Sequence, residues 1–195
     1  EIPKRDWSSD VCSSDLGNSP RIVAAAANRN VIFTTTTGAR RLVDSWNAAA
    51  VYMATTINAT AAARIAVSHG TDVVLIPAGL ATDPSFDAQE DWAASAAVAA
   101  RLGLDLGEGA ERCRAWQQRI NAEGLHALFN SAPHSAKLRR IALDADIAFC
   151  AQMDITDAVP VVTAKTDNGV LVRKAASSAL CNTTAERSKR NSAIS

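Results

Sequence analysis

Three short apolar segments, each followed by a helix-like pattern, constrain the fold more than any other feature of the chain. The segments are residues 30–35, 50–55 and 72–77, and the helical patterns follow at 39–47, at 59–68 and from Asp87 towards Leu102. Alternation of strand and helix is typical of a largely parallel sheet with helices on both faces. The third segment is continuously apolar after Asp72, as strands covered on both faces usually are. The sequence therefore predicts an α/β fold.

The first strand–helix junction carries four consecutive threonines and a glycine. Val31–Phe33 leads into Thr34–Thr37 and Gly38, and Arg40 and Arg41 lie in the first turn of the predicted helix. Unpaired backbone N–H groups and the helix dipole favour an anion at such a junction. Two interpretations stay open, namely an anion site and a threonine-rich strand that ends in a capped helix. A P-loop is excluded, because no lysine follows the glycine.

Polar loops leave all three predicted strands, at residues 34–38, 55–58 and 77–91. In open α/β sheets, ligands bind beyond the carboxyl ends of the strands. These loops are therefore expected to share one edge of the sheet and to form a binding site there.

Composition and charge narrow the classes of function. The chain has 20 basic and 20 acidic residues, so its formal charge gives no general indication of nucleic-acid or membrane binding. No run approaches the ~18 apolar residues of a membrane span. Four cysteines without CxxC spacing predict free thiols in a reducing compartment, hence a cytoplasmic protein.

The second half of the chain is predicted to be more helical. Apolar residues recur at helical spacing over 108–130, with Gly124 as a weak point, and another helix is expected over 133–143. Residues 146–150 are apolar but of uncertain type. The favoured turn Asn168-Gly169 then separates two short apolar segments, which predicts a β-hairpin.

The two ends of the chain differ from the rest. Residues 1–16 look like the in-frame translation of a sequencing adapter, so this leader is excluded from the predicted fold. The alternative is a natural disordered leader. One α/β domain is expected over residues 17–175, and the polar tail over 176–195 is expected to be disordered.

An ordered series of segments resembles the 2-phosphosulfolactate phosphatases. In chain order these segments are Leu16–Pro20, Phe33–Gly38, Asn58-Ala59, Ile76–Gly79, Glu90-Asp91, Ser131–His134, Asp146–Gln152 and Val159-Pro160. The resemblance implies a three-layer α/β/α fold with a largely parallel or mixed sheet. It also implies a Mg²⁺-dependent phosphatase that hydrolyses 2-phosphosulfolactate to sulfolactate, a step of coenzyme M synthesis. Another small phosphorylated acid is the alternative substrate.

The chain also departs from the family pattern. The family usually has asparagine before the glycine of the threonine turn and threonine after it, where this chain has Thr37 and Ala39. The family's N-terminal half carries an aspartate and an arginine–alanine–threonine segment that have no counterpart here. We therefore expect an N-terminally truncated fold with impaired activity. An exposed sheet edge is expected to favour dimerisation or aggregation.

The resemblance and the residue chemistry together predict the residues of the site. Mg²⁺ takes oxygen ligands and keeps several waters, so one or two carboxylates can hold it. Glu90 and Asp91 are the predicted catalytic and metal-binding pair, with helix capping as the alternative role of Glu90. The predicted substrate-binding residues are Asn18, Thr35, Thr36, Gly38 and Asn58.

Three alternatives remain open at this stage. Asn58 also fits a plain helix N-cap. His134 could act as a general acid, although a single histidine near a helix start is more often structural. For the whole chain, the alternative to a phosphatase is a non-catalytic fragment that binds an anion or has a structural role.

Overall fold

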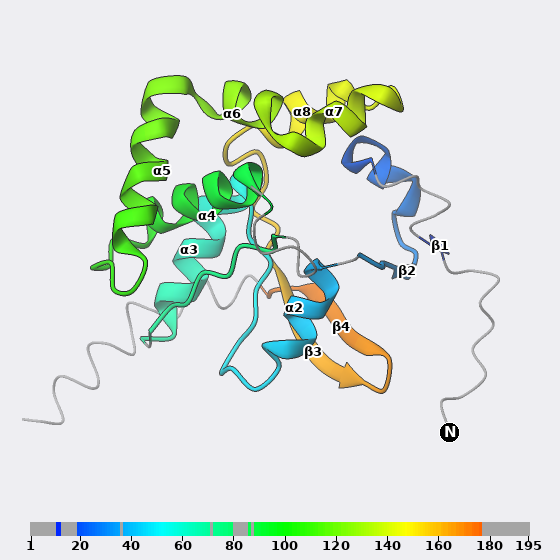
Figure 1. Ribbon diagram of the computed structural model, residues 1–195. Helices are drawn as coiled ribbons and strands as arrows, with labels where there is room; N and C mark the ends of the chain where they lie inside the picture. Colours follow the sequence, from blue (N-terminus) through cyan, green and yellow to red (C-terminus); the bar gives the residue numbers. More distant parts are fainter. Residues whose placement is uncertain are drawn as a thin grey trace, which may run out of the picture.

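The computed structural model describes residues 11–12, 19–35, 37–70, 72–79, 86 and 88–176 (Figure 1). The predicted disordered tail, apart from Ala176, lies outside the described residues, as does most of the predicted leader. Among the described helices, none combines the length and the apolar character that a membrane crossing requires.

Two alanine-rich helices pack against each other at the centre of the molecule. Helix α3 spans Ala59–Ser68, as the sequence predicts, and helix α4 spans Gln89–Leu102. Their buried positions are mostly alanine, so the two backbones can approach closely. Gly70 ends α3 with a φ of +65°, a conformation that glycine adopts without strain.

A second layer of helices covers the other side of α4 (Figure 1). Its members are α5 (Ala110–Glu123), α6 (Leu125–Ser131), α7 (Pro133–Arg140) and α8 (Asp144–Cys150). The predicted weak point at Gly124 is a complete break between α5 and α6, where φ is +80°. The apolar core between these helices and α4 is formed by Ala93, Ala96, Trp116, Leu128, Phe129 and Ile147. Residues 146–150, whose type the sequence left uncertain, are thus helical and belong to α8.

The described strands form two small sheets. Strands β3 (Pro160–Thr166) and β4 (Gly169–Lys174) form the predicted antiparallel hairpin. Its turn lies one residue earlier than predicted, because Gly169 already pairs with Thr166. Strand β1 (Val11-Cys12) pairs in parallel with β2 (Val31-Ile32). Part of the leader, which was excluded from the predicted fold, thus pairs with the rest of the chain. The chain is thus a mixed α/β protein.

The predicted parallel sheet of three strands is wrong for the described residues. The first segment is reduced to β2 and is followed by α2, which spans Gly38–Asp44. The second segment lies antiparallel to β3, where the Met53 N–H donates to the Pro160 carbonyl at 2.9 Å. The third segment, residues 72–77, forms no strand.

Residues 72–77 nevertheless keep the side-chain alternation of a strand. Val74 and Ile76 are 78% and 51% exposed, whereas Val73 and Leu75 are half-buried. This two-residue period is that of a strand with one covered face. Within the described part of the chain, no backbone hydrogen bond pairs this segment with another. The extended backbone agrees with the prediction, but the predicted covering of both faces is wrong for this segment, because one face is exposed and no described strand pairs with it.

Candidate functional site

The predicted residues Thr35 and Gly38 lie at the start of α2. The Thr35 hydroxyl accepts a hydrogen bond from the Ala39 backbone N–H at 2.9 Å. A Cβ added to Gly38 would come within 3.1 Å of this hydroxyl oxygen, so the close approach favours glycine. The Thr35 hydroxyl thus satisfies one of the otherwise unpaired N–H groups of the helix start. This contact favours the capped-helix interpretation for Thr35.

The loop that follows residues 72–77 forms hydrogen bonds with both α2 and α4. On one side, Arg41 Nε of α2 donates to the Ala78 carbonyl at 3.5 Å. On the other side, the Gly79 backbone N–H donates to Asp91 Oδ2 in the first turn of α4, at 2.8 Å. Gly79 has a φ of +63°, so this conformation strongly favours glycine. Arg41, three residues beyond the first predicted loop, therefore contacts the third predicted loop at Ala78.

Asp91 is a partly desolvated carboxylate. Burial raises the pKa of Asp91 above its ordinary value, and the adjacent Glu90 charge adds to the increase. The hydrogen bond from Gly79 and the nearby His134 act in the opposite direction on this pKa. A cation bound beside Asp91 would favour its ionised form for the same electrostatic reason.

Glu90 divides its two carboxylate oxygens between different environments. Oε1 lies 2.8 Å from Nδ1 of His134, whose ring packs against Phe86 with centroids 4.7 Å apart. Oε2 is buried and has no hydrogen-bond partner among the described residues. Helix α4 is preceded by Ala88 as its N-cap residue. Asp87, where the sequence pattern of this helix begins, lies outside the described residues. The described hydrogen bond of Glu90 thus goes to α7, and not to the start of α4.

The Glu90-Asp91 pair fits a hard divalent cation. Both side chains offer carboxylate oxygens. The buried Oε2 atom of Glu90 has no hydrogen-bond donor, so a cation could take the place of one. No group of three or more histidine, cysteine, aspartate or glutamate side chains gathers in metal-binding geometry within the described ranges. A cation at this pair would therefore complete its coordination with waters or substrate oxygens, as Mg²⁺ commonly does.

Asn58 is a buried structural residue at the junction of η3 (Thr56–Asn58) and α3. Its Nδ2 donates to the carbonyls of Met53 and Ala158, at 3.3 and 3.0 Å. Its Oδ1 accepts from the Thr55 N–H at 2.9 Å. The amide is thus occupied by backbone groups, which favours a structural role over contact with a ligand.

Two predicted substrate-binding residues, Asn18 and Thr36, lie outside the described residues. The next residue along the chain from Asn18, Ser19, donates its hydroxyl to Asp146 Oδ1 at 2.9 Å, and Asp146 is 3% exposed. Ser19 and Asp146 belong to two separate segments of the family resemblance, and their contact was not predicted. A separation of 127 residues leaves no local signal for this contact.

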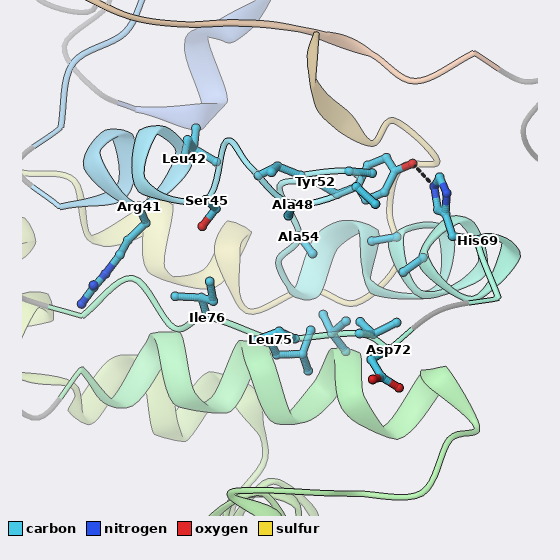
Figure 2. Close-up of a pocket in the computed structure, with 18 of the residues that line it drawn as sticks. Arg41, Leu42, Ser45, Ala48, Tyr52, Ala54, His69, Asp72, Leu75 and Ile76 are labelled. Carbon is cyan, nitrogen blue, oxygen red and sulfur yellow. Dashed lines mark hydrogen bonds between the residues drawn. The ribbon is translucent and has the colours of Figure 1, made fainter. Parts of the chain in front are cut away.

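One groove of the described structure is lined in part by α4 and does not include the acid pair. This groove of about 490 Å³ is bordered by α3, α4 and the extended segments around Tyr52 and Leu75. Figure 2 shows Arg41 near one end and the hydrogen-bonded Tyr52 and His69 near the other, with 2.5 Å between the Tyr52 hydroxyl and His69 Nε2. Its walls are mainly apolar, so geometry alone does not make it the phosphate site.

Comparison with known proteins identifies the family. A family model described as 2-phosphosulpholactate phosphatase matches residues 8–165. A protein of Thermus thermophilus named "Probable 2-phosphosulfolactate phosphatase" is 34% identical over 169 residues, which cover 83% of this chain and 69% of the relative. A protein of Clostridium beijerinckii with the same name is 30% identical over 155 residues, or 75% of this chain and 62% of the relative.

The chain therefore spans between 62% and 69% of the length of these two relatives. The resemblance found in the sequence is confirmed by the family match, which covers most of the chain. This chain belongs to the 2-phosphosulpholactate phosphatase family.

Proposed function

We propose that this protein is a Mg²⁺-dependent phosphatase for a small phosphorylated acid, with 2-phosphosulfolactate as the preferred substrate. The observation that carries the proposal is the acid pair at the start of α4. There Asp91 accepts the Gly79 N–H, and the neighbouring Glu90 has a buried oxygen without a donor. Membership of the family supports the reaction class, and the names of the relatives support the choice of substrate.

Each side chain of the proposed site has a distinct role. Glu90 and Asp91 would hold Mg²⁺, which when bound neutralises phosphate charge and helps to align in-line attack. Asn18, Thr35, Thr36 and the Gly38 backbone remain the proposed contacts for substrate oxygens. Arg41 adds positive charge next to the Ala78-Gly79 loop. Asn58 is better explained by its contacts with the protein backbone.

The remaining parts of the proposal concern the whole protein. We propose that the whole protein has a three-layer α/β/α arrangement, in which residues 72–77, unpaired among the described residues, would pair with a further strand. The alternating exposure of this segment and its unpaired backbone support that arrangement. We also propose that the protein acts in the cytoplasm and that its reaction is a step of coenzyme M synthesis.

The test is an assay of the chain with Mg²⁺ against 2-phosphosulfolactate and p-nitrophenyl phosphate. We expect phosphate release that EDTA abolishes and that Asp91→Ala reduces by at least about a hundredfold. Asp157→Ala is a suitable control, because Asp157 is exposed and lies outside the acid pair. Phosphate release that survives both EDTA and Asp91→Ala would contradict the proposed site.

A non-catalytic anion-binding fragment is the second candidate function. It is favoured by the contact of the Thr35 hydroxyl with the Ala39 N–H, which gives the threonine turn a structural role. Retained phosphate binding without any turnover would support this candidate over the phosphatase.

A further inference from the structure

His134 lies in the first turn of α7, and its side chain is 51% exposed. Pro133 precedes it at the first helical position, where proline's fixed φ suits a helix start. The hydroxyl oxygen of the buried residue Ser135, the next residue, lies 2.6 and 2.7 Å from the carbonyl oxygens of Ala132 and Asn130 and can donate its proton to either. These contacts fix the beginning of the helix and therefore limit the positions that the His134 ring can take.

The ring of His134 contacts two groups near the acid pair. Its Nδ1 atom lies 2.8 Å from Glu90 Oε1, and its face lies against Phe86. A neutral histidine with the proton on Nδ1 can donate this hydrogen bond, so the contact does not require a charged ring. One oxygen of Glu90 is thus occupied and its orientation restricted, whereas Oε2 stays without a donor.

We propose that His134 is a positioning residue that orients Glu90, so that Oε2 is the oxygen presented to a divalent cation. This inference rests on the proposed Mg²⁺-dependent function. Groups that hydrogen-bond to a metal-binding carboxylate fix its orientation, and losing one typically weakens metal binding by about 10- to 100-fold. His134 itself does not bind the cation or the substrate.

A purely structural role predicts a different result. The contact between His134 and Glu90 also ties α7 to α4, so its loss could lower stability and leave cation binding unchanged. The two roles are separated when cation affinity and melting temperature are measured on the same variants.

The experiment uses three substitutions in the full chain, with His134→Gln as a fourth in reserve. His134→Phe keeps a ring against Phe86 but removes the donor, whereas His134→Asn keeps an N–H donor close to the position of Nδ1. His126→Phe is the matched control, because His126 is exposed on α6. Mn²⁺ binding, followed by electron paramagnetic resonance, and Mg²⁺ binding, followed by calorimetry, give the affinities.

We expect His134→Phe to weaken cation binding by about 10-fold or more. His134→Asn and His126→Phe should bind within about twofold of the unsubstituted chain. Equal affinity of His134→Phe and the unsubstituted chain would overturn the positioning role and leave the proposed phosphatase intact. No cation binding by the unsubstituted chain would instead contradict the proposed metal site, and this inference with it. If His134→Phe fails to fold, the cation affinities of His134→Gln and His134→Asn are compared instead. A lower affinity of His134→Gln supports the positioning role of His134, and equal affinities overturn it.

Discussion

At the scale of single residues, the amide of Asn58 holds two backbone segments together, one at residues 53–55 and one at Ala158. It connects Thr55, Met53 and Ala158 from a position that is only 3% exposed. Truncation would leave buried N–H and C=O groups without partners, and such groups are costly to leave unsatisfied. The side chain of Glu90 differs from that of Asn58, because its buried Oε2 atom has no hydrogen-bond donor among the described residues.

Asn58→Ala is therefore expected to lower the free energy of unfolding by about 2–4 kcal/mol. Urea denaturation followed by circular dichroism measures this change. The control is Asn47→Ala, because Asn47 is exposed and should change the free energy by no more than about 0.5 kcal/mol. Similar small effects of both substitutions would show that the Asn58 amide does not hold the segments together.

At the scale of elements, the N-terminus of α3 is capped by a residue distant in the sequence. Asp154 accepts hydrogen bonds from the Thr60 N–H at 2.7 Å and the Thr60 hydroxyl at 2.8 Å. Arg101, near the end of α4, donates to the same carboxylate at 3.1 Å. One side chain thus satisfies the start of α3 and connects it with the end of α4.

Asp154→Ala should lower the free energy of unfolding at pH 7 by about 1 kcal/mol, as loss of a helix cap usually does. Thermal denaturation at several NaCl concentrations measures the effect, and salt should reduce it only in part, because uncharged donors also contribute. Asp157→Ala, an exposed residue of the same loop, is the control. An equal loss of stability in both variants would contradict the capping role.

The same carboxylate predicts a pH dependence of stability. Burial raises the pKa of Asp154, but the hydrogen bonds from Thr60 and Arg101 outweigh this effect and hold the pKa below its ordinary value. The stabilisation from the ionised group is thus complete above the unfolded pKa of about 3.9 and is lost as pH falls through the lower folded value. The stability difference between Asp154→Ala and the unsubstituted chain should therefore shrink below about pH 4. A constant difference between pH 3 and pH 7 would contradict this assignment.

Elements were predictable where their signals are local. The bounds of α3 follow from Asn58, the alanine run and Gly70, which all lie within one short stretch. The strand pattern of residues 72–77 was also visible, but pairing depends on segments elsewhere in the chain. For the same reason, the Glu90–His134 contact, across 44 residues, was not predictable.

At the scale of the whole molecule, the predicted strands leave apolar side chains exposed. Phe33, Met53, Val74 and Ile76 come from the three predicted strands and are between 37% and 78% exposed. Residues 72–77 also carry backbone groups without hydrogen-bond partners within the described chain. An unpaired apolar edge of this kind favours association with other chains.

We therefore expect the chain to self-associate at micromolar concentration. The double substitution Val74→Lys and Ile76→Lys should shift it towards the monomer, because charged edge residues oppose strand pairing. Size-exclusion chromatography with light scattering over a concentration series measures this shift. Leu104→Lys is the control, since Leu104 is 45% exposed but lies outside the predicted strands. A monomer with a cooperative melting transition at all concentrations would contradict the expectation.

The most direct test of the proposed site is an amide chemical-shift titration of the full chain with inorganic phosphate and Mg²⁺. The signal of Gly38 reports on the start of α2, and the signal of Gly79 reports on the loop that contacts Arg41 of α2 and Asp91 of α4. Signals of Tyr52 and His69 report on the groove. The predicted result is a saturable, Mg²⁺-dependent shift at Gly38 and Gly79, with little change at Tyr52 and His69. Shifts confined to the groove, or no saturable shift at Gly79, would contradict a phosphate site at Gly38 and Gly79.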